Sequence, residues 1–159
     1  DEMIPVQALH VAANGLGAAG VAVRWHVSRG IGHGIAPDGL ELAGKFLADG
    51  FAGAYAKWPT GSYLIWYPVK SRRATDTLAR QVAAAAAASK PPGKCLRLEF
   101  SVAPQAAGGP LTSTGLLIVN PPWTLAGELK TILPELEKPL GQGGAGRFRL
   151  ETPKPWIRP

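Results

Sequence analysis

The sequence has few of the features that indicate secretion, membrane insertion or a metal centre. It contains a single cysteine, Cys95, which excludes an internal disulfide and fits a reducing cytoplasm. No apolar run approaches the roughly 20 residues that cross a bilayer, and the first residues lack the basic start and apolar centre of a signal peptide. The three histidines have no cysteine or carboxylate at metal-ligand spacing. We therefore expect a cytoplasmic chain without a membrane span or a metal site.

The composition favours a chain that can form a hydrophobic core and that has an anionic partner. Hydrophobic residues make up 46% of the 159 residues, which is enough for a core. The net charge of +6 favours a partner that is rich in phosphate. The 15 prolines and 20 glycines indicate a loop-rich chain or an incomplete domain.

Residues 1–37 show no periodic face that would hold them on a core. Short strands are predicted at 6–13 and 21–27. Residues 15–20 (GLGAAG) match the G-x-G-x-x-G pattern of dinucleotide-binding loops. That mechanism needs a helix that begins at the third glycine, so that its N-terminus faces the phosphates. Because residues 21–25 look extended, the pattern does not predict a cofactor loop here.

From residue 40 onward, apolar runs and helical periodicity alternate, as expected for part of an α/β layered fold. The predicted helices are 40–57, 74–89 and 125–138, the last one broken near Pro134, and the predicted strands are 62–69, 94–103, 114–120 and an edge strand at 147–151.

Two of these strands carry specific expectations about burial. Residues 62–69 (SYLIWYPV) form an uncharged apolar run, which predicts a strand buried on both faces, as in a parallel sheet. In 94–103, apolar residues alternate with Arg97, Glu99 and Ser101, which predicts that these three side chains face water.

The most specific short motif is Asn120-Pro121-Pro122-Trp123 at the end of an apolar strand. Methyltransferases that modify an exocyclic base amine use a polar residue, two prolines and an aromatic. The polar side chain accepts a hydrogen bond from the amine, the prolines fix the backbone, and the ring stacks on a flipped base. The alternative is a rigid strand-to-helix turn with a buried tryptophan.

Two stretches resemble one known family. Lys57–Lys70 (KWPTGSYLIWYPVK) and Gly115–Leu125 (GLLIVNPPWTL), followed by Ile132-Leu133-Pro134, are similar in order and spacing to the large-subunit rRNA methyltransferase J family. The resemblance covers about residues 40–150. It implies a class I, Rossmann-like fold that binds S-adenosylmethionine and methylates an adenine N6 in 23S rRNA.

The resemblance also implies that the catalytic motif is missing. The family's working motif is an earlier Asp-Pro-Pro-Tyr, whose place here is taken by Ile35-Ala36-Pro37-Asp38-Gly39, and its cofactor loop has no counterpart. The Asn120 motif would follow the last, antiparallel strand, at the sheet edge away from the ligand crevice. We therefore expect residues 1–38 to be unmatched and 39–159 to be the C-terminal portion of a truncated class I methyltransferase sheet. Asn120 is then only a weak catalytic candidate.

The part of the family's site that could survive is the end of the 62–69 strand. By the resemblance, Trp66, Tyr67 and Pro68 would lie at the edge that holds the catalytic motif, with Tyr67 and Pro68 lining the substrate crevice and Lys70 nearby. Lys70, Arg72 and Arg73 directly follow this strand and could contact RNA phosphates, although a solvated helix start is the more common role of such charges.

Three functional hypotheses follow. The first is a truncated 23S rRNA adenine-N6 methyltransferase that is inactive alone. The second is a basic RNA-binding or interaction module without catalysis. The third is an active enzyme that uses residues 15–20 and Asn120. We also expect self-association, because the uncharged strand 62–69 would present an unpaired edge.

Overall fold

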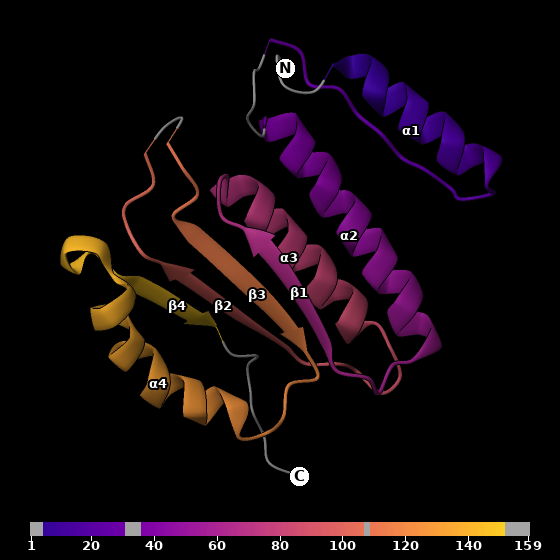
Figure 1. Ribbon diagram of the computed structural model, residues 1–159. Helices are drawn as coiled ribbons and strands as arrows, with labels where there is room; N and C mark the ends of the chain where they lie inside the picture. The colour runs from indigo at the N-terminus through magenta and orange to yellow at the C-terminus, as the bar shows by residue number, and fades with distance from the viewer. Residues whose placement is uncertain (1–4, 31–35, 107–108, 152–159) are drawn as a thin grey trace. The chain divides into compact units, whose positions relative to one another are not determined.

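The computed structural model describes residues 5–30, 36–106 and 109–151. The chain divides into two compact units, residues 1–43 and 44–159, and the division falls within helix α2 (Pro37–Lys57). Figure 1 shows the helices and strands of both units. Within the described ranges, no helix combines the length and the apolar character that a membrane span requires.

The first unit contains helix α1 (Val6–Ala18), none of whose residues is buried. The strand expected at 6–13 is therefore wrong. The segment is rich in alanine, the strongest helix former, and a short apolar run does not distinguish a strand from a helix. Residues 21–28 form neither helix nor strand, so the strand expected at 21–27 is also wrong.

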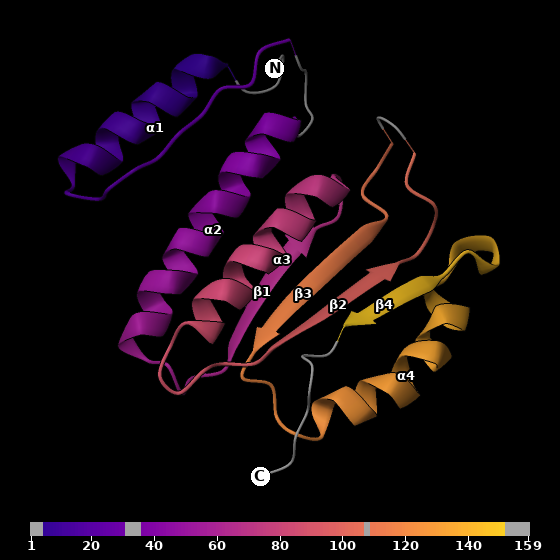
Figure 2. The ribbon, with the colours of Figure 1, turned by 180° about the vertical axis from the view of Figure 1, so that it is seen from behind.

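The second unit is built on a four-stranded sheet. Its strands are β1 (Tyr63–Pro68), β2 (Cys95–Ser101), β3 (Ser113–Val119) and β4 (Arg147–Glu151), which confirms the four predicted ranges. The order across the sheet is β1-β3-β2-β4, and every neighbouring pair is antiparallel (Figure 2). Strands β1 and β2 thus run in one direction, with β3 reversed between them.

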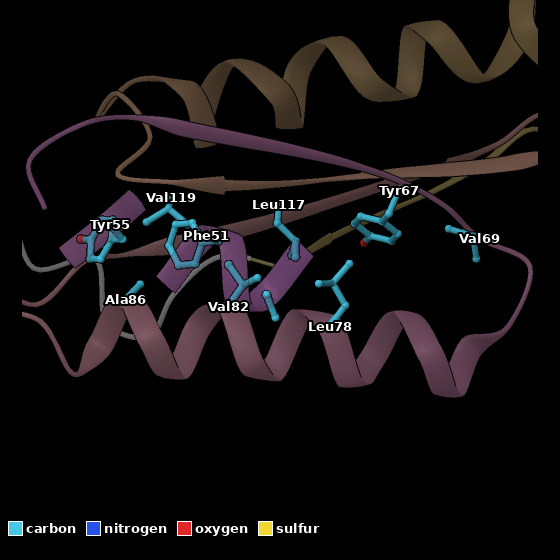
Figure 3. Close-up of a cluster of buried hydrophobic side chains, with 10 residues drawn as sticks. Phe51, Tyr55, Tyr67, Val69, Leu78, Val82, Ala86, Leu117 and Val119 are labelled. Carbon is cyan, nitrogen blue, oxygen red and sulfur yellow. The ribbon is translucent and has the colours of Figure 1, made fainter. Parts of the chain in front are cut away.

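Helix α3 (Arg72–Ala87) covers one face of this sheet. It begins where Ser71 Oγ accepts a hydrogen bond from the Ala74 amide, and a run of alanines sustains it. The core lies between α3, the end of α2 and the sheet, as Figure 3 shows. Its largest side chains belong to Tyr55, Tyr67 and Phe51, which are 2%, 2% and 5% exposed.

Helix α4 (Leu125–Leu140) lies on the other side of the sheet from α3 (Figure 3). It continues through Pro134, so the expected break is wrong. Proline removes one intrahelical hydrogen bond, while the neighbouring Leu133 is buried at 2% exposure. A single 3-10 turn, Gln142–Gly144, then leads into β4.

The burial expected for two strands differs from the structure. Leu64 and Trp66 of β1 are 66% and 56% exposed, so β1 is not buried on both faces. In the described residues it pairs only with the antiparallel β3, rather than within a parallel sheet. On β2 the charged side chains of Arg97 and Glu99 are buried, at 6% and 4% exposure, instead of facing water.

Candidate functional site

A cavity of about 450 Å³ lies at the end of the sheet where β1 and β2 finish. Ser101 ends β2, Ser113 begins β3, and the Val69 amide donates to the Ser113 carbonyl at 2.9 Å. The walls come from these strand ends, the loop after β2 and the start of β4. The described lining residues are Val69, Lys70, Arg72, Ser101, Ala103, Pro104, Gln105, Ser113, Ala145 and Arg147.

The cavity is positively charged. Lys70, Arg72 and Arg147 line it, and no carboxylate is among its described lining residues. Arg72 forms an ion pair with the buried Glu99, which offsets its charge. Lys70 instead donates to the Gly109 carbonyl, and Arg147 donates to backbone carbonyls of the preceding turn. Two positive charges are therefore left without a carboxylate partner in the described part of the chain.

Polar side chains fix the shape of the cavity wall. The Ser113 hydroxyl donates to the Ser101 hydroxyl at 2.7 Å, across the β2–β3 pair. In the loop between these strands, Gln105 Oε1 accepts from Thr112 and its Nε2 donates to the Pro110 carbonyl. These hydrogen bonds connect residues within the loop and join the ends of β2 and β3. Both the sheet and the β2–β3 loop therefore fix the shape of the cavity.

Beneath α3 lies a network of charged residues that supports the cavity from the core side. The Arg97 guanidinium reaches Glu99 Oε1 at 2.6 Å and Asp76 Oδ1 at 2.7 Å, and the Tyr67 hydroxyl donates to Glu99 Oε1 at 3.0 Å. Arg72 forms the link to the cavity. With Arg149 and Glu151 at its outer end, the network holds three arginines and three carboxylates, which explains how charges can be buried on this face.

Burial and pairing act in opposite directions on this network. Burial raises the pKa of Tyr67 to about 12, so its hydroxyl stays protonated and available as a donor. Burial alone would raise the pKa of Glu99, but hydrogen bonds from Arg72 and Arg97 outweigh it and lower that pKa. Both groups are thus fixed in the states that the hydrogen bonds require, which is a structural role.

Asn120 joins the end of β3 to the turn between α2 and β1. Its Nδ2 donates to the carbonyls of Pro59 and Gly61, both at 2.9 Å, and its amide lies 3.3–3.4 Å from the Tyr55 hydroxyl. Its backbone has a φ of 51°, a left-handed conformation that asparagine tolerates better than most residues. The side chain is thus engaged within the chain rather than directed at a substrate amine. The turn alternative fits better, except that Trp123 is 70% exposed and not buried.

Four residues were expected at a substrate crevice, and they differ in burial and in whether they reach the cavity: Trp66, Tyr67, Pro68 and Lys70. Lys70 lines the cavity. Tyr67 is 2% exposed and packs in the core, which is incompatible with the expected lining role, because a fully covered ring cannot contact a substrate. Pro68 is half-buried, and Trp66 is exposed on the face opposite Tyr67. A substrate contact by Trp66 stays a prediction.

The glycine-rich motif of the first unit is not a helix-opening loop. Gly15 and Gly17 lie in the last turns of α1, and Gly20 follows its end with a φ of 76°. A helix C-terminus presents carbonyls, which repel phosphate. Of the segment 35–39, residue 35 lies outside the described residues, and Asp38 in the first turn of α2 bonds to His26 and Ser28. No cluster of three or more metal-binding side chains occurs among the described residues.

The sequence interpretation missed Arg147 and the hairpin residues Ser101, Gln105 and Ser113. Arg147 is far from Lys70 in sequence, and only the antiparallel pairing of β4 with β2 brings it to the same edge. The single signal available beforehand was the excess of basic residues, which does not say where they gather.

One solved structure and two related sequences show the class of protein to which this arrangement belongs. The crystal structure of protein LPL1258 from Legionella pneumophila matches with a TM-score of 0.61 and 27% sequence identity, over 72% of this chain and 40% of that one. Ribosomal RNA large subunit methyltransferase J from Haemophilus influenzae is 34% identical over 122 residues, and that from Escherichia coli is 29% identical over 113 residues. The class is therefore that of methyltransferase-like α/β proteins.

A family model assigns the chain more narrowly. Residues 45–153 match the model described as ribosomal RNA large subunit methyltransferase D, RlmJ. The chain belongs to this family, which confirms the resemblance found in the sequence. The two methyltransferase J relatives align with 77% and 71% of this chain, but with only 39% and 37% of their own length. The chain thus spans about two fifths of the relatives that it matches.

Proposed function

We propose that this chain forms the RNA-contacting part of an S-adenosylmethionine-dependent methyltransferase that acts on an adenine N6 of 23S rRNA in the cytoplasm. We further propose that it does not transfer methyl groups alone. The family match over residues 45–153 carries the first proposal. The second is supported by the match to two fifths of the relatives and by the internal engagement of Asn120.

Methyl transfer requires a bound donor and an acceptor group within hydrogen-bond reach of the amine. The motifs that would supply both have no counterpart in residues 1–159. In this proposal the cofactor and the catalytic groups come from residues outside this sequence, in the same or another chain. The present residues contribute the basic cavity and its sheet.

A transfer assay tests this function. The purified chain is incubated with methyl-labelled S-adenosylmethionine and unmethylated 23S rRNA, and RNA binding is measured in parallel. We expect RNA binding without label transfer. Transfer of label by the chain alone would contradict the proposal of inactivity. Absence of RNA binding would contradict the RNA-contacting role.

The basic cavity also favours a second candidate, an RNA-binding module that never takes part in methylation. Titration with S-adenosylmethionine after addition of the family's missing portion as a separate chain distinguishes the two. Restored cofactor binding and methyl transfer support the first proposal, in which the chain is the RNA-contacting part of a methyltransferase. RNA binding by the chain, with no cofactor binding and no transfer after the addition, supports the module.

A further inference from the structure

We propose that the cavity at the ends of β1 and β2 is a binding site for a phosphate group of the RNA backbone, held by Lys70 and Arg147. This inference rests on the proposed function and specifies which surface contacts the RNA and through which chemical group. It commits to the backbone, and not to a base.

The charges that line the cavity favour an anionic ligand. Lys70 and Arg147 have no carboxylate partner in the described structure, whereas the Arg72 charge is offset by Glu99. Lys70 has three N–H donors and arginine has five, so both keep donors beyond the carbonyl contacts that they make. Two cations with free donors attract an anion, and phosphate oxygens accept several such bonds at once.

The composition of the walls selects phosphate over a base. No aromatic side chain is among the described lining residues. Proteins read single-stranded bases by stacking them on aromatic rings, whereas they bind the backbone through lysine, arginine and hydroxyl groups. The Ser101 and Ser113 hydroxyls in the cavity wall are of the second kind.

The position in the fold is the third step. β1 and β2 run in the same direction and end at this cavity. The fold thereby places Lys70, which follows β1, and Arg147, which begins β4, on the walls of one cavity. The cavity of about 450 Å³ is large enough for a phosphate together with its sugar.

The test measures binding of a fluorescent single-stranded RNA by anisotropy over a range of salt concentrations. Lys70→Gln and Arg147→Gln are compared with the wild-type chain and with Lys130→Gln, which removes an equal charge from the exposed surface of α4. We expect each cavity variant to lose about tenfold in affinity at low salt and to reduce the salt slope by about one unit. Lys130→Gln should change affinity by less than about twofold. Lys70→Arg should retain most of the binding, since it keeps the charge.

Each outcome decides a separate point. If the wild-type chain binds RNA and both cavity variants bind it with the same affinity as Lys130→Gln, the phosphate site is overturned but the proposed function stands. Wild-type chain that binds no RNA overturns both. Inorganic phosphate is titrated separately by NMR. Phosphate-induced shifts at Ser113, combined with unchanged RNA affinity of the variants, would show a free-anion site and overturn the backbone assignment. Far-UV circular dichroism verifies that each variant is folded.

Discussion

Replacement of Asn120 tests whether the Asn-Pro-Pro-Trp motif is structural. The Asn120 amide donates two hydrogen bonds at 2.9 Å to carbonyls in the turn before β1. Each such bond contributes about 1 kcal/mol net to folding. Alanine would also adopt a φ of 51° less readily than asparagine, at a cost of about 1 kcal/mol. We therefore expect Asn120→Ala to lower the free energy of unfolding by about 3 kcal/mol, and Asn120→Gly by about 2 kcal/mol, because glycine avoids the φ cost.

Asn120→Asp gives the sharpest contrast between the two roles. As an acceptor for a substrate amine, aspartate would replace asparagine without loss. As a structural clamp it should fail, because a carboxylate cannot donate to the Pro59 and Gly61 carbonyls and is repelled by them. We expect Asn120→Asp to be at least as destabilised as Asn120→Ala at neutral pH.

Urea denaturation followed by circular dichroism measures these differences. Tyr55→Phe serves as a control for the shared hydrogen bond, and its effect should be less than additive with Asn120→Ala, since both remove the same contact. An Asn120→Asp variant as stable as the wild-type chain would refute the clamp. So would an Asn120→Ala variant that loses less than about 0.5 kcal/mol.

Three further predictions concern the sheet. Burial alone would raise the pKa of Glu99, but arginine hydrogen bonds lower that pKa in the folded chain. The ionised Glu99 therefore contributes fully to stability above its ordinary pKa of 4.5, and this contribution is lost as the pH falls through its lower pKa in the folded chain. Glu99→Gln should flatten this acid-side loss in urea midpoints measured against pH, and an unchanged profile would contradict it. Gly115→Ala places a Cβ 2.3 Å from the Tyr67 ring and should cost about 2 kcal/mol in the same assay, whereas Gly53→Ala, with open space in α2, should stabilise by about 0.5 kcal/mol. Sedimentation should show concentration-dependent association of the wild-type chain, reduced by Trp66→Lys at the β1 edge; a wild-type monomer at all concentrations would contradict it.

The positions of the strands could be predicted from the sequence, but their surroundings could not. Residues 94–103 alternate with a period of two, and β2 occupies Cys95–Ser101 as expected. The alternation does not show which face is buried when charges of both signs share one face. Arg97 and Glu99 can be buried because they pair with each other, and because Arg97 also pairs with Asp76 and Glu99 with Arg72. That pairing depends on α3 and is not visible in a local pattern.

The candidate site was predictable to a similar degree. Lys70 was found because it directly follows an apolar strand that the family resemblance marks. Tyr67 was assigned to a crevice, although alternation along β1 places it on the covered face with Ile65. Arg147 could not be found, because its place depends on the pairing of β4 with β2, which no local pattern specifies.

The strand directions separate the two site candidates that the sequence offered. β3 begins with Ser113 at the cavity wall and ends with Val119, directly before Asn120. Seven residues of extended chain span about 20 Å at roughly 3.4 Å per residue. Lys70 and Asn120 therefore lie at opposite ends of the sheet, and one base cannot contact both. A single substrate-binding surface in this chain can therefore include only one of these two residues. Lys70 and Arg147, which have no carboxylate partner among the residues that the structure describes, favour the Lys70 end. The Asn120 side chain already forms hydrogen bonds to the turn before β1.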